Sequence, residues 1–123
     1  MWKELQNGWL PPDEISRREY RYIKDNKDEL PHLTGFVGFG CSFAGKWFGG
    51  YAHSDNRNYC LNAHNSVLNK IKNLEKVEFY NLDYKDVDIP KGSLVYCDIP
   101  YRNTTQYCKS EVGEFNHEEF YEW

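Results

Sequence analysis

The chain has 123 residues, enough for one small domain. Its net charge of −4 excludes a protein that is basic throughout, so any contact with nucleic acid has to come from local basic patches. Mean hydropathy is −0.83, low for a self-sufficient core, and 17% of the residues are aromatic. This balance fits either a wet binding surface or one part of a larger protein.

The sequence contains no signal peptide and no transmembrane run, which predicts a cytoplasmic protein with no membrane partner. None of the four cysteines forms a C-x-x-C pair, and the histidines are not at zinc-finger spacing, so we expect no metal site. Cys41 and Cys97 lie in apolar runs, which predicts buried, reduced thiols.

The first elements are marked by local signals. Residues 1–12 end in Pro11-Pro12 and are expected to be extended or turning. Ser16 and Glu19 have the spacing of a capping box, which predicts a helix from about 17 to 28. Its inward side chains are expected to be Tyr20, Ile23 and Tyr22.

Residues 34–52 hold six of the nine glycines, interleaved with aromatic side chains. A regular strand does not tolerate so many glycines. We therefore expect a short helical or irregular start, followed by a glycine-rich aromatic loop.

The second half of the chain predicts two helices and two strands. Apolar residues at helical spacing predict a helix over 59–74, with inward side chains from Ala63, Val67, Leu68, Ile71 and Leu74. Residues 77–82 and 94–98 read as strands, and the loop 99–114 as polar and flexible. A last helix is expected over 115–123, capped by Asn116 or a neighbour.

The most informative stretch is Asp98-Ile99-Pro100-Tyr101, which follows the second strand. In open α/β sheets, ligands bind beyond the carboxyl ends of strands. A carboxylate, a proline carbonyl and an aromatic face together suit a flat, amine-bearing ring, because the acid accepts a hydrogen bond from the amine and the ring stacks on the tyrosine. Asp83-Tyr84 follows the other strand in the same way, although an exposed strand-end acid is an equally good explanation there.

The glycine-rich stretch has three possible interpretations. Gly40 to Lys46 fits a phosphate loop, but Trp47 stands where a metal-binding Ser or Thr is required. The dinucleotide fingerprint fails because Phe43 replaces its third glycine. The letters of Phe36-Val37-Gly38-Phe39-Gly40 match the third, the glycine motif with which methyltransferases bind S-adenosylmethionine.

As an ordered set, several stretches resemble the D12 class of DNA adenine-N6 methyltransferases, in its phage and prophage subfamily. Asp98 to Tyr101 is similar to the Asp-Pro-Pro-Tyr motif, with Ile99 in place of the first proline. The other stretches are 35–40, 45–51, 57–59, Asp83-Tyr84, 103–107 and 115–123, so the resemblance covers nearly the whole chain.

The resemblance implies methyl transfer from S-adenosylmethionine to N6 of a flipped adenine in double-stranded DNA. Asp98, Pro100 and Tyr101 would be the catalytic residues. Hydrogen bonds to the carboxylate and to a main-chain carbonyl localise the N6 lone pair, and Tyr101 clamps the base. Asp83 and Tyr84 would approach the adenine of the cofactor. Ile99 removes the backbone restraint that the family proline supplies.

In the family's register, this chain begins after the cofactor motif. The expected fold is α/β, a partial Rossmann-like methyltransferase sheet with strands at about 77–82 and 94–98 and a helical, glycine-rich aromatic insertion. Residues 1–65 would be the DNA-facing segment and 66–123 part of the catalytic domain. The expected DNA contacts are Lys46, Trp47, Tyr51 and Arg102, with a packed aromatic loop as the alternative for the first three.

Two other interpretations stay open at this point. The chain could be a non-catalytic DNA-binding remnant, or a partner subunit that works with a separate amino-terminal half. Alternatively, Phe36 to Gly40 is a compact cofactor loop, with Gly38 and Gly40 against S-adenosylmethionine.

Overall fold

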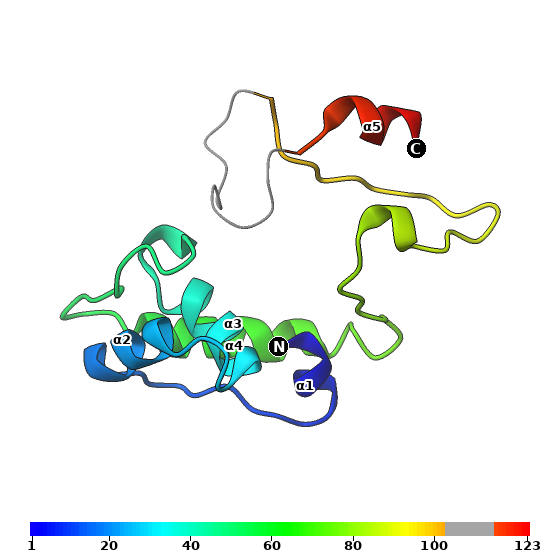
Figure 1. The fold of residues 1–123 in the computed structure, drawn as a ribbon. Helices are drawn as coiled ribbons and strands as arrows, with labels where there is room; N and C mark the ends of the chain where they lie inside the picture. Colours follow the sequence, from blue (N-terminus) through cyan, green and yellow to red (C-terminus); the bar gives the residue numbers. More distant parts are fainter. Residues whose placement is uncertain (103–114) are drawn as a thin grey trace. The chain divides into compact units, whose positions relative to one another are not determined.

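The computed structural model describes residues 1–102 and 115–123 (Figure 1). The chain separates into two compact units, unit 1 (Met1–Phe79) and unit 2 (Tyr80–Trp123). This boundary reflects packing, and the functional division expected at residue 65 stays a prediction. Each unit is described by itself below.

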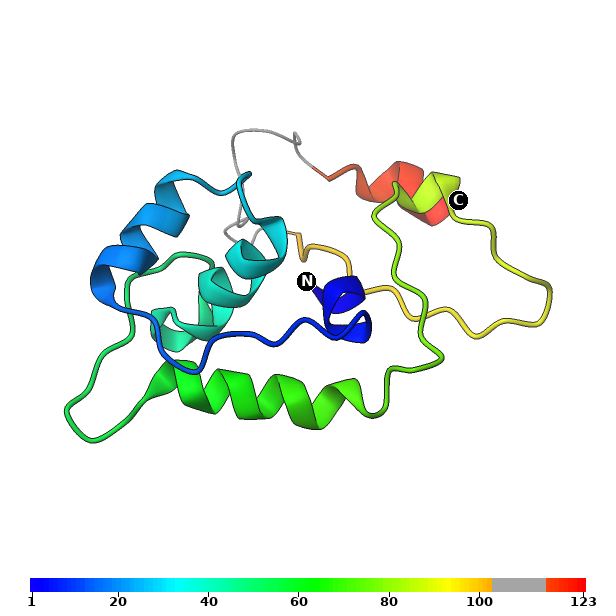
Figure 2. The same ribbon diagram turned by 90° about the horizontal axis from the view of Figure 1, so that it is seen from below.

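Unit 1 contains four α-helices and one turn of 3-10 helix. They are α1 (Trp2–Gln6), α2 (Arg17–Asp25), α3 (Pro31–Gly40), η1 (Phe43–Gly45) and α4 (Tyr59–Ile71). The longest of them, α4, is seen along its full length in Figure 2. Helix α3 packs against both α2 and α4, so it is the central element of the unit.

The capping box predicted for α2 is confirmed. The Ser16 hydroxyl accepts a hydrogen bond from the Glu19 amide at 3.2 Å, and the Glu19 carboxylate accepts one from the Ser16 amide at 2.8 Å. Tyr20 and Ile23 are buried as predicted, whereas Tyr22 is exposed. The helix ends at Asp25, before the predicted residue 28, because the Asn26 side chain and amide both donate to the Tyr22 carbonyl.

Helix α3 begins with Pro31 at its first turn and runs through three glycines to Gly40. The chain then folds back on itself as an aromatic loop, residues 43–51. An isolated antiparallel bridge between Ser42 and Tyr51 closes this loop, and the Ala52 amide donates to the Cys41 carbonyl at 3.0 Å. The predicted helical start and glycine-rich aromatic loop are therefore confirmed.

Helix α4 holds the segment that follows α1. The side chains of Asn58, Cys60 and His64 hydrogen-bond to the carbonyls of Asp13, Pro12 and Pro11. In Figure 2 this segment runs alongside α4. Helix α1 itself has no side-chain cap and was not predicted. It is tied to the end of α4 by Gln6, whose side-chain amide donates to the carbonyls of Leu74 and Val77.

The hydrophobic core lies wholly in unit 1. Its buried members come from α2, α3 and α4, from residues that flank α2 and α3, and from the aromatic loop. They are Ile15, Tyr20, Ile23, Phe36, Val37, Cys41, Phe48 and Cys60. The helix predicted over 59–74 ends at Ile71, so four of the five side chains predicted to point inward lie in α4 and Leu74 follows it. All five are half-buried, and two of them, Ala63 and Val67, pack directly against this core.

The predicted α/β sheet is wrong for the residues that the structure describes. Residues 77–82 and 94–98 form no strand, and the Ser42–Tyr51 bridge is the one β-pairing found there. An apolar run becomes a buried strand only when neighbouring strands satisfy its backbone and cover its side chains. Here Leu94 is 98% exposed and Tyr96 is 89% exposed. Cys97, predicted to be buried, is exposed as well.

The described residues of unit 2 contain two short helical segments, η2 (Tyr84–Asp86) and α5 (His117–Glu122). The predicted last helix is confirmed, with Asn116 as its cap: the Asn116 side chain accepts a hydrogen bond from the Glu119 amide at 3.2 Å. Most of the loop predicted at 99–114 lies outside the described residues.

Candidate functional site

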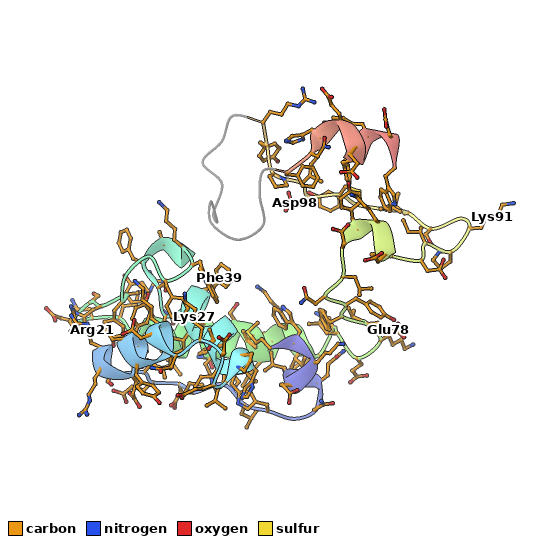
Figure 3. All side chains as sticks on the ribbon, in the orientation of Figure 1. Arg21, Lys27, Phe39, Glu78, Lys91 and Asp98 are labelled. Atoms are coloured by element: carbon orange, nitrogen blue, oxygen red, sulfur yellow. The ribbon has the colours of Figure 1, made fainter. Side chains whose placement is uncertain are left out.

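Asp98 and Pro100 line an open cavity of about 550 Å³ in unit 2. Asp98 is exposed on an extended segment, where Figure 3 labels it. A second wall comes from the stretch between η2 and this segment, including Val87, Asp88 and Pro90. The cavity is lined mainly by apolar and aromatic side chains, with Asp88 and Asp98 as its two carboxylates.

Aromatic rings grouped around Tyr84 form a third wall of this cavity. The ring centroid of Tyr84 lies 5.1 Å from that of Phe120, 5.2 Å from that of Trp123 and 6.1 Å from that of Phe115. We call these four residues the Tyr84 cluster. An exposed ion pair between Lys85 and Glu119 lies beside it and joins η2 to α5.

This geometry combines a carboxylate acceptor with several π faces. A carboxylate accepts hydrogen bonds from an exocyclic amine, and aromatic rings stack on a flat heterocycle or hold it edge to face. Pockets that bind small molecules commonly have this composition, with apolar walls and a few polar groups that fix the orientation. The cavity therefore suits a planar, amine-bearing ring.

Three other predicted site residues do not line this cavity. Tyr101 is 74% exposed and does not line the cavity. The Asp83 carboxylate accepts a hydrogen bond from the Lys85 amide at 3.0 Å and so caps η2, while its neighbour Tyr84 lines the cavity. The guanidinium of Arg102 lies 6.0 Å from the ring centroid of Tyr121.

The three residues of the aromatic loop predicted to contact DNA differ in their surroundings. Lys46 is exposed, at the end of η1. Trp47 is half-buried and packs against Phe39 and Phe48, with ring centroids 4.8 Å and 4.7 Å away. Tyr51 donates a hydrogen bond to the Ile15 carbonyl at 2.7 Å, and burial raises the pKa of its phenol. Of the three side chains, Lys46 is the one that is fully exposed, and its positive charge is accessible to a DNA phosphate.

Basic side chains from α2 and the following turn lie against the same loop. The Arg17 guanidinium is 5.5 Å from the ring centroid of Tyr51, and the Lys27 ammonium, labelled in Figure 3, is 6.0 Å from that of Phe48. Lys24 donates to the Phe48 carbonyl at 3.4 Å. With Lys46, these cations and the loop form what we call the basic–aromatic surface.

Gly38 and Gly40 serve close packing within α3. A β-carbon added to Gly38 would lie 2.3 Å from the Trp47 ring, and one added to Gly40 would lie 2.8 Å from the Ala63 β-carbon. The Gly38 carbonyl accepts hydrogen bonds from the Phe48 amide and the Ser42 hydroxyl. The glycines therefore leave no room beside their α-carbons for S-adenosylmethionine, and this part of the chain does not fit that cofactor.

Sequence reasoning missed several of these residues. Phe120 and Trp123 are three residues apart, which places them on one helical face, and that spacing was the available signal for the Tyr84 cluster. Lys24 follows Arg17 by seven residues on α2 and shares its face, but solvated basic residues on a helix are so common that this spacing alone did not single out Lys24.

Over residues 1–102 and 115–123, no helix is both long and apolar enough to cross a membrane. Within the same ranges, no three or more His, Cys, Asp or Glu side chains are grouped so that they could hold a metal ion.

No family model matches the sequence, no curated protein matches it, and no solved structure matches it. Any functional conclusion therefore rests on the chain's own residues.

Proposed function

We propose that this chain binds an adenine base of DNA in the unit 2 cavity and takes part in methylation of its N6 atom, with S-adenosylmethionine as the methyl donor. One observation carries the proposal: Asp98 and Pro100 of the Asp-x-Pro-Tyr stretch line the same cavity as the Tyr84 cluster. The same cavity thus holds a carboxylate that could accept a hydrogen bond from the amine and aromatic side chains that could stack on the ring.

The roles of the chain's residues follow from the chemistry of adenine. The N6 lone pair is delocalised into the ring, which makes this nitrogen a poor nucleophile. A hydrogen bond from N6 to the Asp98 carboxylate favours a localised lone pair, and a second one to a main-chain carbonyl near Pro100 would fix its direction. The rings of Tyr84, Phe120 and Trp123 would hold the base once it has left the DNA stack.

The first test is methyl transfer by the full chain. Purified chain is incubated with S-adenosylmethionine and a duplex rich in adenine contexts, and N6-methyladenine is measured by mass spectrometry. Calorimetry of the same folded chain reports binding of the methyl donor. Asp98→Ala is expected to abolish methylation, because the acceptor for the N6 amine is lost.

The matched control is Asp86→Ala, which removes an exposed carboxylate of η2 outside the cavity lining. It is expected to retain methylation. Equal activity in Asp98→Ala and the unaltered chain would contradict the role of Asp98. A folded chain that neither binds the donor nor methylates DNA would reject the enzymatic proposal.

A second function, DNA binding without catalysis, is favoured by the basic–aromatic surface of unit 1. Arg17, Lys24, Lys27 and Lys46 place cations along the aromatic loop, beside the half-buried Tyr51 ring and the buried Phe48, and cations beside aromatic side chains are typical of surfaces that bind nucleic acid. Fluorescence anisotropy with labelled duplex at several salt concentrations tests it. Lys46→Ala is expected to weaken binding and to make its salt dependence shallower by about one counterion, whereas exposed Lys91→Ala in unit 2 leaves both unchanged.

A further inference from the structure

Two buried cysteines of unit 1 lie together where α3 ends and α4 begins. Cys41 follows the last residue of α3 and is 1% exposed, and Cys60 lies in the first turn of α4 and is 6% exposed. Both belong to the one core cluster, and the two thiols are close enough to shift each other's pKa. The proposed function uses neither of these cysteines.

The backbone around this pair supports close approach of the two sulfurs. Gly40 packs so tightly on α4 that an added β-carbon would lie 2.8 Å from that of Ala63. Cys60 lies three residues before Ala63 and therefore on the same face of α4. Cys60 also donates from Sγ to the Pro12 carbonyl at 3.4 Å, which holds its side chain at the helix end.

We propose that Cys41 and Cys60 are a thiol pair that hydrogen peroxide converts to a disulfide in the folded protein. This inference goes beyond the proposed function and does not depend on it. The cross-link would join the two ends of the stretch that carries Lys46, Trp47 and Tyr51, so that oxidation restrains the basic–aromatic surface at its base.

The two cysteines have different chemical roles in this reaction. The neighbouring Cys60 thiol lowers the pKa of the Cys41 thiol, and the neighbouring Cys41 thiol raises the pKa of Cys60. Since the thiolate is the nucleophile, Cys41 is the residue that reacts with the oxidant and Cys60 the one that resolves the product.

The steps balance in atoms and electrons. The Cys41 thiolate attacks one peroxide oxygen, the O–O bond breaks and a sulfenic acid forms, with hydroxide taking up the thiol proton as water. The Cys60 sulfur then attacks the Cys41 sulfur, the S–O bond breaks, and the Cys60 proton leaves with the hydroxyl group as a second water. The two thiols lose two electrons, and one peroxide is reduced to two waters.

Peptide mapping of the native full chain tests the pair directly. Trypsin separates the two cysteines, because it cuts after Lys27, Lys46, Arg57 and Lys70 and so places Cys41 in residues 28–46 and Cys60 in residues 58–70. After brief treatment with a small excess of hydrogen peroxide and blocking of free thiols, mass spectrometry under non-reducing conditions is expected to show these two peptides linked. Cys97 falls in a separate peptide, residues 92–102.

Two variants and one stability measurement complete the test. Cys60→Ser keeps a donor for the Pro12 carbonyl but is expected to abolish the cross-link, whereas exposed Cys97→Ser retains it. Closing the loop restricts the unfolded chain, so the oxidised protein is expected to melt roughly 10 °C above the reduced one. In Cys60→Ser, peroxide is expected to produce no such rise.

Three results would overturn the inference, and all can be read from the unaltered chain. In the first, both thiols stay reduced in the folded protein and link only in urea. In the second, Cys41 is oxidised to a sulfinic acid without linkage. In the third, the main linked peptides contain Cys97.

Discussion

At Tyr20, one phenol oxygen joins three parts of unit 1. The Gly50 amide donates to it at 3.2 Å, and it lies 2.7 Å from the Ser42 hydroxyl. Because Ser42 itself donates to the Gly38 carbonyl at 2.7 Å, the Tyr20 hydroxyl is the donor to Ser42. The Tyr20 side chain thereby joins both ends of the aromatic loop to α2, and Ser42 extends the connection to α3.

Removing this hydroxyl is expected to destabilise the protein. Tyr20→Phe leaves the Gly50 amide and the Ser42 hydroxyl without their buried partner, which should lower the free energy of unfolding by about 1–2 kcal/mol. Urea unfolding followed by tryptophan fluorescence measures the change. Tyr22→Phe is the matched control, because its hydroxyl bonds to Glu29 at an exposed site, and it should unfold as the unaltered chain does.

Two glycines of α3 make a second matched pair. A β-carbon at Gly38 meets the Trp47 ring at 2.3 Å, whereas one at Gly35 meets the Met1 β-carbon at an ordinary 3.5 Å. Gly38→Ala is expected to cost about 1–3 kcal/mol of stability through overpacking. Gly35→Ala should gain up to about 1 kcal/mol from helix propensity. Equal unfolding midpoints for the two variants would show that the Trp47 ring moves aside without cost.

At the scale of the element, local signals were sufficient to predict the helices that begin with a capping side chain. The ends of α2, α4 and α5 are set by Ser16, Asn58 and Asn116, each of which caps a backbone amide within three residues. Helix α1 has no such cap and is held by distant contacts of Gln6, so no local pattern predicted it. The predicted strands were wrong for a related reason: whether a strand forms depends on pairing with segments far along the chain, which a local pattern does not show.

The candidate site follows the same rule. Asp98 and Pro100 could be singled out because they are adjacent in sequence and chemically distinctive. The rings that share their cavity come from η2 and α5, and only the fold brings them together. Lys46 was predicted as a DNA contact because a lysine among glycines and aromatic residues is unusual. The contacts of Lys24 and Lys27 with the same loop, in contrast, depend on how α2 packs.

The capping box of α2 also gives a pH dependence. Hydrogen bonds from the Ser16 side chain and amide hold the pKa of Glu19 below its ordinary value. A carboxyl group whose pKa is lower in the folded state stabilises that state above the unfolded pKa, and this contribution disappears as pH falls through the folded pKa.

The Glu19→Gln variant tests this contribution. Glu19 is exposed, so the effect is expected to be about 0.5 kcal/mol or less. The difference in unfolding free energy between the unaltered chain and Glu19→Gln should therefore be present near pH 6 and vanish as pH falls through the lowered pKa of Glu19 in the folded state. Urea unfolding at a series of pH values measures it, with Glu75→Gln, an exposed position beyond the end of α4, as the control. A difference that persists at low pH would contradict the capping role of the ionised carboxylate.

At the scale of the whole molecule, the two units differ in what holds them. Every buried side chain among the described residues belongs to unit 1, whereas unit 2 has a half-buried Tyr84 cluster and an exposed ion pair. Burial of apolar side chains is the main source of folding free energy, and regions that lack it open locally. The apolar run over residues 94–98 thus has its side chains exposed in this structure.

Hydrogen exchange of the full chain is expected to divide the molecule at the same boundary. Amides of α3, beside the fully buried Phe36 and Val37, should exchange only through global unfolding of unit 1. Amides of residues 94–98 should exchange near the rate of an unstructured peptide. Mass spectrometry of peptic fragments measures both in one experiment. Protection of 94–98 comparable to that of α3 would mean that this run pairs as a strand in solution, because a backbone amide resists exchange only when it is hydrogen-bonded and kept from water.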